Sequence, residues 1–193
     1  MRGILSVLLL VLPALPLAVQ ARIPLQQVDE WTRDYDAHFR KYSKRYFGPH
    51  IDWRWFKSQG IAESGLDPDA ASKAGARGVM QIMPATYTEI RKQNPHFPEV
   101  NVPRWNIAAG IYYDRQLYDK WRSPPPGEER LYFAFGSYNA GYGRIALASR
   151  KAQENPGSWH AVRPYVPSQT RHYVRRIRRL MTEPQVSLTS LEQ

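Results

Sequence analysis

One glutamate, Glu63, has the best placement in this sequence for acid–base chemistry. The residues three to four positions apart before it are Gly60, Phe56 and Trp53, which share one face of a helix with a 3.6-residue period. A carboxyl group on that buried face keeps its proton to higher pH, as a general acid near neutrality must. The alternative is a glutamate that only ends a helix and pairs with a nearby Arg or Lys.

The elements that must position Glu63 are predicted to be helical almost throughout. Asp52 is a suitable N-cap for the Glu63 helix, and Pro84 suits the first turn of a helix that follows a short one. Gly141 is expected to end a helix that carries Leu131, Phe135 and Tyr138 on one face. The predicted helices cover residues 25–47, 52–63, 74–83, 84–93, a long stretch from 106, 131–140, a stretch from 144, and 169–181, with a Pro-rich linker at 156–167. The fold is therefore predicted to be mainly α, with at most a small hairpin.

The N-terminus has the pattern of a secretory signal peptide. A basic start precedes an apolar run over residues 4–19, which is interrupted by Pro13 and Pro16. An uncleaved N-terminal anchor is the alternative. We expect a signal peptide at 1–21, a helical extension at 22–50, one catalytic domain at 51–182 and a disordered tail at 183–193. The chain has no cysteine, so an exported product would carry neither a disulfide nor a lipid on an N-terminal Cys.

The charge of the chain favours a polyanionic partner. Lys and Arg number 27 against 17 Asp and Glu, a formal net charge of +10. A cell-wall glycopeptide, an anionic lipid surface and a nucleic acid would all satisfy this charge. The arginines at 171–179 form either a solvated basic face or an electrostatic contact with the wall or membrane. Charge alone does not separate these classes.

Several motifs occur in a fixed order along the chain. They are Glu63-Ser64, Ser72, the run from Gly75 to Pro84 that contains Gly78-Val79-Met80-Gln81, Asn106-Ile107 with Gly110, Ser137-Tyr138-Asn139-Ala140-Gly141, and Thr170 to Ile177. In order and spacing they resemble the soluble lytic transglycosylase type catalytic domain of the lytic murein transglycosylases, which is related to goose-type lysozyme. The resemblance extends from about Asp52 to Leu180. Two motifs depart mildly from the usual pattern, with Val in Gly-Val-Met-Gln and Ser in Ser-Tyr-Asn.

The resemblance implies a single lysozyme-like domain that cleaves peptidoglycan without consuming water. Glu63 would protonate the bond between N-acetylmuramic acid and N-acetylglucosamine and then act as a base, which gives a 1,6-anhydro product. The substrate-binding residues implied by the family are Ser72, Met80, Gln81, Tyr138 and Asn139. The resemblance implies no cofactor and no metal. Glycan strands of peptidoglycan would be the partner in the periplasm or cell envelope, with envelope machinery as a further partner.

Four of these five helper residues also have a plain structural interpretation. Tyr138 and Met80 suit a hydrophobic core, Asn139 suits the turn before Gly141, and Ser72 suits a helix N-cap.

Two rival functions use the same fold. A hydrolytic muramidase needs a second carboxylate, for which Asp67, Asp69 and Glu89 are the nearest in sequence after Glu63. A catalytically inactive peptidoglycan-binding protein would need no acid at all. A nucleic-acid binder is supported only by charge, and we expect no nucleic-acid partner. The isolated position of Glu63 favours the transglycosylase, because an attacking hydroxyl of the substrate needs no second carboxylate to activate water.

Overall fold

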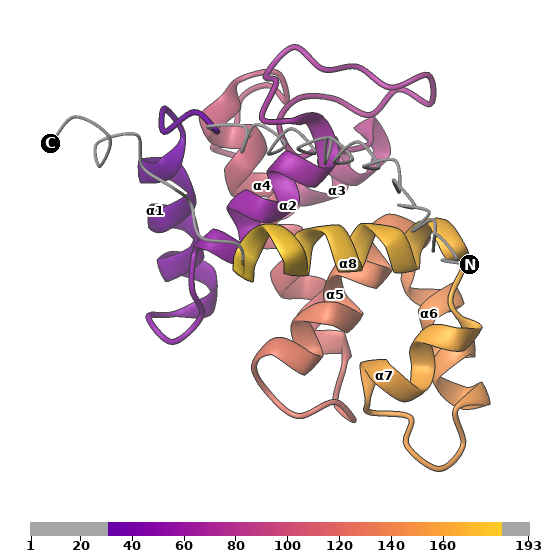
Figure 1. Cartoon of the computed structure of the whole chain (residues 1–193). Helices are drawn as coiled ribbons and strands as arrows, with labels where there is room; N and C mark the ends of the chain where they lie inside the picture. The colour runs from indigo at the N-terminus through magenta and orange to yellow at the C-terminus, as the bar shows by residue number, and fades with distance from the viewer. Residues whose placement is uncertain (1–30, 183–193) are drawn as a thin grey trace, which may run out of the picture.

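The computed structural model describes residues 31–182, which form eight α-helices and one 3-10 helix (Figure 1). They are α1 (Asp36–Phe47), α2 (Arg54–Ser64), α3 (Pro84–Gln93), α4 (Pro103–Lys120), α5 (Glu128–Ala140), α6 (Tyr142–Lys151), α7 (Trp159–Val162), η1 (Arg163–Tyr165) and α8 (Ser168–Thr182). This part of the chain contains no β-strand, and none of its helices combines the length and apolarity needed to cross a membrane. The predicted signal peptide at 1–21 and the predicted tail at 183–193 lie outside the described residues.

The hydrophobic core forms around α5. Every residue from Leu131 to Ser137 is buried, as expected for a helix that neighbouring helices cover on all sides. Helix α5 packs against α4, α6 and α8, and α4 in turn packs against α1 and α3. Helix α8 also lies against α2 and crosses the front of the molecule in Figure 1. The C-terminal helix is therefore brought against the helix that carries Glu63.

Several helix boundaries follow the signals predicted from the sequence. Helix α3 begins at Pro84, whose fixed φ suits a first turn, and α5 ends before Gly141, which has a φ of 87°. Asp52 accepts a hydrogen bond from the Arg54 N–H at 2.9 Å, so its side chain caps the start of α2 from one residue before the N-cap. The last helix was expected at 169–181 and spans Ser168–Thr182.

The helix predicted at 74–83 is wrong. This segment is a loop in which Arg77 forms isolated bridges with Ala71 and Ile82. The residues Gly75, Gly78 and Gln81 have φ values of 92°, 71° and 46°. A right-handed helix cannot include residues in the left-handed region, so apolar periodicity gave a misleading signal here.

The linker predicted at 156–167 is also more ordered than expected, since it contains α7 and η1. Trp159 at the start of α7 is buried, and its ring packs edge-on against Phe133 of α5 with centroids 5.5 Å apart. This aromatic contact fixes the segment against the core in spite of its prolines.

Candidate active site

Glu63 lies in the last turn of α2, and Tyr173 of α8 donates a hydrogen bond to its Oε1 at 2.5 Å. Burial raises the pKa of Glu63 from its ordinary value of 4.5 to about 7, because the charged carboxylate loses solvation. The hydrogen bond from Tyr173 acts in the opposite direction, since it stabilises the charged form. Near neutral pH, both protonation states of Glu63 are therefore accessible.

Two tyrosines, the buried Tyr173 and the half-buried Tyr138, adjoin this carboxyl group. Burial raises the pKa of Tyr138 and of Tyr173 well above the ordinary value, and the negative charge of Glu63 raises both further. The Tyr138 hydroxyl donates to the Met80 carbonyl at 2.8 Å, and its ring packs against Tyr113 with centroids 5.3 Å apart. Both phenols therefore stay protonated and can act only as hydrogen-bond donors and acceptors in the physiological pH range.

The loop over residues 70–82 forms one side of the site, and α2 and α4 hold it in place. Ser64, next to Glu63, donates through its hydroxyl to the Val79 carbonyl at 2.8 Å. The Asn106 amide accepts from the Met80 N–H at 2.7 Å and donates to the carbonyls of Arg77 and Val100, each at 2.9 Å. One side chain of α4 thus satisfies three backbone groups and fixes the loop beside Glu63.

Asn106 also explains why a glycine is needed at position 78. A Cβ on Gly78 would lie 2.6 Å from the Asn106 Nδ2, and the φ of 71° disfavours any other residue. The close approach of the loop backbone to α4 depends on this missing side chain.

A second buried carboxyl group, Asp114 of α4, lies near Glu63. It has no exposed area, and its Oδ1 accepts from the Gln59 Nε2 at 3.2 Å. Asp114 Oδ2 and Gln59 Oε1 are both buried without a hydrogen-bond partner. Burial raises the pKa of Asp114 well above its ordinary value, and the charge of Glu63 raises it further. The charged form of Asp114 is therefore disfavoured, and more so once Glu63 has become charged.

Of the predicted helper residues, Tyr138 and Met80 lie at the site as part of the core and loop. The Met80 side chain has no exposed area and packs against Gly110, while its carbonyl accepts the Tyr138 hydroxyl. This placement matches the core interpretation that the sequence left open for Met80.

Gln81, Asn139 and Ser72 have hydrogen bonds within the protein. Gln81 Nε2 donates to the carbonyls of Ala70 and Gly78 at 3.1 and 3.0 Å, and Asn139 Oδ1 accepts from the Thr170 hydroxyl at 2.8 Å. Ser72 Oγ accepts from the Ala76 N–H at 3.0 Å, so its recorded bond supports the loop rather than Glu63. Ser72 therefore caps a turn, and the helix predicted after it at 74–83 is absent.

The carboxylates considered in the sequence as a second catalytic group are placed differently from Asp114. Asp67 and Asp69 are exposed, and Asp67 Oδ1 accepts from the Asp69 N–H at 2.9 Å in a side-chain turn. Glu89 is exposed on α3 and pairs with Lys92 at 2.7 Å.

Three residues of this site were missed as functional candidates in the sequence. Tyr173 and Asn106 belong to motifs that carry the resemblance, but neither is among the catalytic or substrate-binding residues that the sequence predicts. Asp114 gave no local signal, because an acid on a long helix is usually solvated. Its burial depends on the packing of α4 against the rest of the core.

Comparison with known proteins identifies the family to which this arrangement belongs. Residues 41–160 match the Transglycosylase SLT domain family, which is more than half of the chain. The chain belongs to this family. It is 33% identical over 161 residues to the membrane-bound lytic murein transglycosylase F of Erwinia tasmaniensis, an alignment that covers 80% of this chain and 30% of that protein.

Solved structures show the same fold. The chain is similar to the 70 kDa soluble lytic transglycosylase of Escherichia coli, with a TM-score of 0.61, 27% identity, and coverage of 78% of this chain and 24% of that one. It is also similar in fold to an inactive mutant of the lytic transglycosylase Slt of Pseudomonas aeruginosa, with a TM-score of 0.64, 22% identity, and coverage of 82% and 26%. The prediction of a mainly helical, lysozyme-like domain is confirmed. The chain spans less than a third of each of these relatives.

Proposed function

We propose that the chain is a peptidoglycan lytic transglycosylase in which Glu63 acts first as an acid and then as a base. The observation that carries the proposal is the desolvated Glu63 carboxyl, whose pKa of about 7 lets it give and take a proton near neutrality. Membership of the Transglycosylase SLT domain family and the names of the relatives support the reaction class.

The proposed reaction consumes no water. Glu63 transfers its proton to the oxygen that bridges N-acetylmuramic acid and N-acetylglucosamine, and the bond from the anomeric carbon to that oxygen breaks. The N-acetyl carbonyl of the substrate stabilises the cationic anomeric carbon. The charged Glu63 then accepts the proton of the C6 hydroxyl, whose oxygen bonds to the anomeric carbon and closes a 1,6-anhydro ring. Glu63 ends the cycle protonated, as it began.

The tyrosine on α8 has a positioning role in this proposal. Tyr173 donates to Oε1 of Glu63, so the proton that is transferred would be carried by Oε2. The same hydrogen bond stabilises the carboxylate formed after the first proton transfer. Because the nucleophile is part of the substrate, its effective concentration is high, and a desolvated site protects the reactive sugar from water.

The remaining helper residues divide into two groups. For Gln81, Tyr138 and Asn139 we propose contacts with the glycan: both N–H groups of the Gln81 amide are used within the loop, so its carbonyl oxygen would accept from a sugar amide. Asn139 would donate through its amide nitrogen, because its oxygen already accepts from the protein. For Ser72 and Met80 we propose support of the loop.

A hydrolytic muramidase is the second candidate, and the buried acid near Glu63 that could serve it is Asp114. This group has no exposed area and its charged form is disfavoured by burial, so it is poorly suited to act as a nucleophile or as a base toward water. Export to the periplasm or cell envelope, directed by residues 1–21, completes the proposal because the substrate lies outside the cytoplasm.

The test is mass spectrometry of the fragments that the chain releases from purified wall sacculi, with Glu63→Gln as the control. Products one water lighter than hydrolysis gives, and absent with the variant, are the expected result. Products with a free reducing end would establish the hydrolase. If neither protein released a product, an inactive peptidoglycan-binding domain would be the better interpretation.

A further inference from the structure

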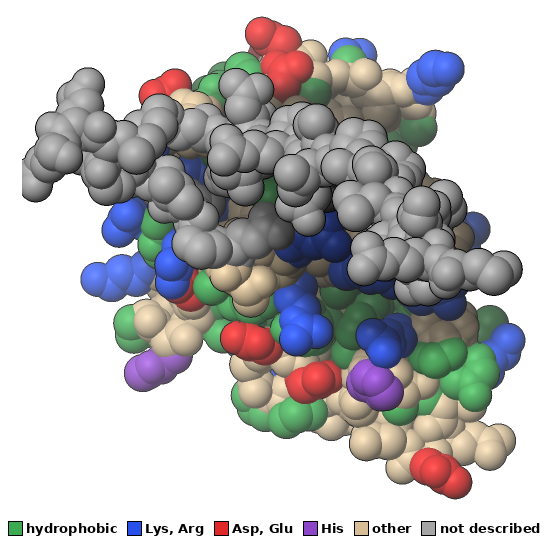
Figure 2. Space-filling view, in the orientation of Figure 1, with side chains coloured by type: hydrophobic (Ala, Val, Ile, Leu, Met, Phe, Trp, Pro, Cys, Tyr) green, Lys and Arg blue, Asp and Glu red, His purple; other side chains and the backbone are tan. Residues whose placement is uncertain are grey.

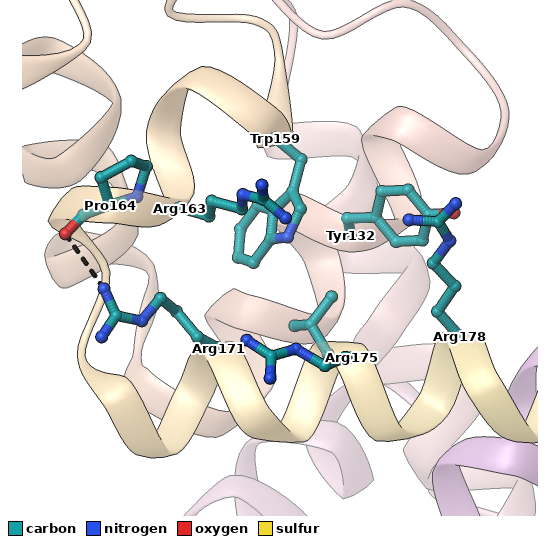
Figure 3. A pocket seen from close by; sticks show the side chains of 8 residues that line it. Tyr132, Trp159, Arg163, Pro164, Arg171, Arg175 and Arg178 are labelled. Carbon is teal, nitrogen blue, oxygen red and sulfur yellow. Dashed lines mark hydrogen bonds between the residues drawn. The ribbon is translucent and has the colours of Figure 1, made fainter.

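A hollow lined by arginines lies on the side of α8 that faces away from Glu63. Its volume is about 360 Å³, and α5, α7, η1 and α8 enclose it (Figure 3). The lining residues are Tyr132, Trp159, Arg163, Pro164, Arg171, Val174, Arg175 and Arg178. Half of these residues are arginines, and the catalytic proposal gives none of them a role.

The helical period explains why the arginines gather on this side. Arg171, Arg175 and Arg178 are spaced four and three residues apart, so they project from one face of α8. Tyr173, which binds Glu63, lies on the opposite face of the same helix. Figure 3 shows Arg163 across the hollow from the α8 arginines, next to Trp159. A ligand in the hollow would therefore leave the Glu63 site open.

The arginines of the hollow lack acidic partners within residues 31–182. The salt bridges in that range involve other residues. Among the four arginines of the hollow, Arg171 donates a hydrogen bond to the Pro164 carbonyl at 3.2 Å. Two nearby acids are engaged, since Glu129 accepts from the Trp159 N–H and Glu128 from the Tyr132 hydroxyl. Four guanidinium groups around one hollow repel one another and leave many donors for an anion.

The walls of the hollow indicate which anion fits. Trp159 and Tyr132 are 9% and 8% exposed, and with Val174 they give the hollow flat, largely apolar walls between the charges. Figure 2 shows Lys and Arg side chains gathered over α8, with hydrophobic side chains between them. A concave site with both features suits a peptide that bears carboxylates better than a flat lipid surface. Guanidinium groups bind carboxylates through two parallel hydrogen bonds.

We propose that this hollow binds the carboxylate-bearing peptide side chains of peptidoglycan. The choice of polymer rests on the proposed function, whereas the preference for an acidic peptide rests on the hollow itself. Peptide binding there would hold the domain on the wall while the Glu63 site engages a glycan strand, so one face of α8 serves catalysis and the other serves attachment.

The test is binding of Glu63→Gln chains to two ligands: intact sacculi, measured by co-sedimentation, and soluble glycan strands from which an amidase has removed the peptides, measured by isothermal titration calorimetry. The charge-removing variant is Arg171→Gln/Arg175→Gln. The matched control is Arg91→Gln/Arg150→Gln, which removes two exposed arginines from α3 and α6. We expect the α8 variant to bind intact sacculi on the order of tenfold more weakly than the control. Glycan without peptides should bind all of these chains equally.

A second variant, Arg171→Lys/Arg175→Lys, keeps the charge but loses the forked donor geometry, and intermediate binding is expected. Equal loss in the α8 variant and the control would overturn the proposal, because net charge alone would then explain binding. Weakened binding of the α8 variant to peptide-free glycan would overturn it as well. So would a defect seen only with vesicles that contain phosphatidylglycerol, since the ligand would then be a lipid. Product release is measured separately with Glu63 intact: a chain that binds intact sacculi but cleaves nothing would contradict the proposed function and not this site.

Discussion

Replacing Glu63 by Gln should stabilise the folded chain at neutral to alkaline pH. In the folded state the pKa of Glu63 is about 7, whereas its ordinary value of 4.5 applies to the unfolded chain. Between these two values the folded chain holds a proton that the unfolded chain has released. The stability of the wild type therefore falls as the pH rises through this window, and the stabilising contribution is fully present only below it.

The size of the effect follows from the two pKa values. A change from 4.5 to about 7, at 1.36 kcal/mol for each tenfold change in the equilibrium constant, corresponds to about 3 kcal/mol. Gln carries no titrating proton, and its Oε1 can still accept the Tyr173 hydroxyl. The effect of the substitution is the free energy of unfolding of Glu63→Gln minus that of the wild type. This difference should be larger at about pH 8 than at about pH 4, by up to about 3 kcal/mol.

Urea unfolding of both proteins at the two pH values measures this difference, provided that the slopes with denaturant agree. Glu89→Gln is the matched control: Glu89 is 68% exposed and its ion pair with Lys92 lies on the surface, where such pairs contribute little. The difference between this control and the wild type should depend little on pH. If the Glu63→Gln difference were equally insensitive to pH, Glu63 would titrate as an ordinary carboxyl group and the acid role proposed for it would lose its physical basis.

Three further predictions concern the groups around the site. Tyr173→Phe removes a hydrogen bond that lowers the pKa of Glu63, so the alkaline fall of kcat/KM should move to higher pH; a move to lower pH would contradict the assignment. Asp114→Asn should leave the pH profile of kcat/KM unchanged, because burial disfavours the charged form of Asp114 and Asn is neutral as well; a shift of the Glu63 pKa to a lower value would mean that Asp114 is charged in the wild type. Gly78→Ala should lower the free energy of unfolding by at least about 1–2 kcal/mol, measured by urea unfolding, because φ is 71° and the new Cβ meets an amide 2.6 Å away. Gly143→Ala, which meets no atom within 4 Å, should not destabilise.

The helical framework was largely predictable because its signals are local. Pro84 and Gly141 set helix boundaries through their own backbone preferences, which neighbouring elements do not change. Phe56 and Gly60 of the Glu63 helix are buried as predicted, but so is every residue from 55 to 61, whereas Trp53 and Glu63 are half-buried. The loop at 70–82 could not be predicted in this way. Its apolar residues repeat like those of a helix, and only the left-handed backbone at three positions shows that they serve a turn.

The chemistry of the site was predictable only as far as Glu63 itself. Its partner Tyr173 is 110 residues away in sequence, and the sequence around that tyrosine does not indicate which group its hydroxyl contacts. Nothing in a single sequence distinguishes a tyrosine that fills a core from one whose hydroxyl ends at a carboxylate. The contact exists because α8 crosses α2, which is a property of the assembled fold.

Asp114 shows that the number of carboxylates near an acid distinguishes a hydrolase from a transglycosylase less well than the protonation states of those carboxylates do. The sequence favoured a lone Glu63, but the structure places a second acid, Asp114, close enough for the charge of Glu63 to raise its pKa. In a two-carboxylate hydrolase, the second group must be ionised while the acid still holds its proton. Here burial and the Glu63 charge both raise the pKa of Asp114, so ionisation of the second acid is disfavoured. Glu63, whose pKa is about 7, changes charge near neutrality, and a single group that alternates between acid and base suits a reaction whose nucleophile is the substrate's own hydroxyl.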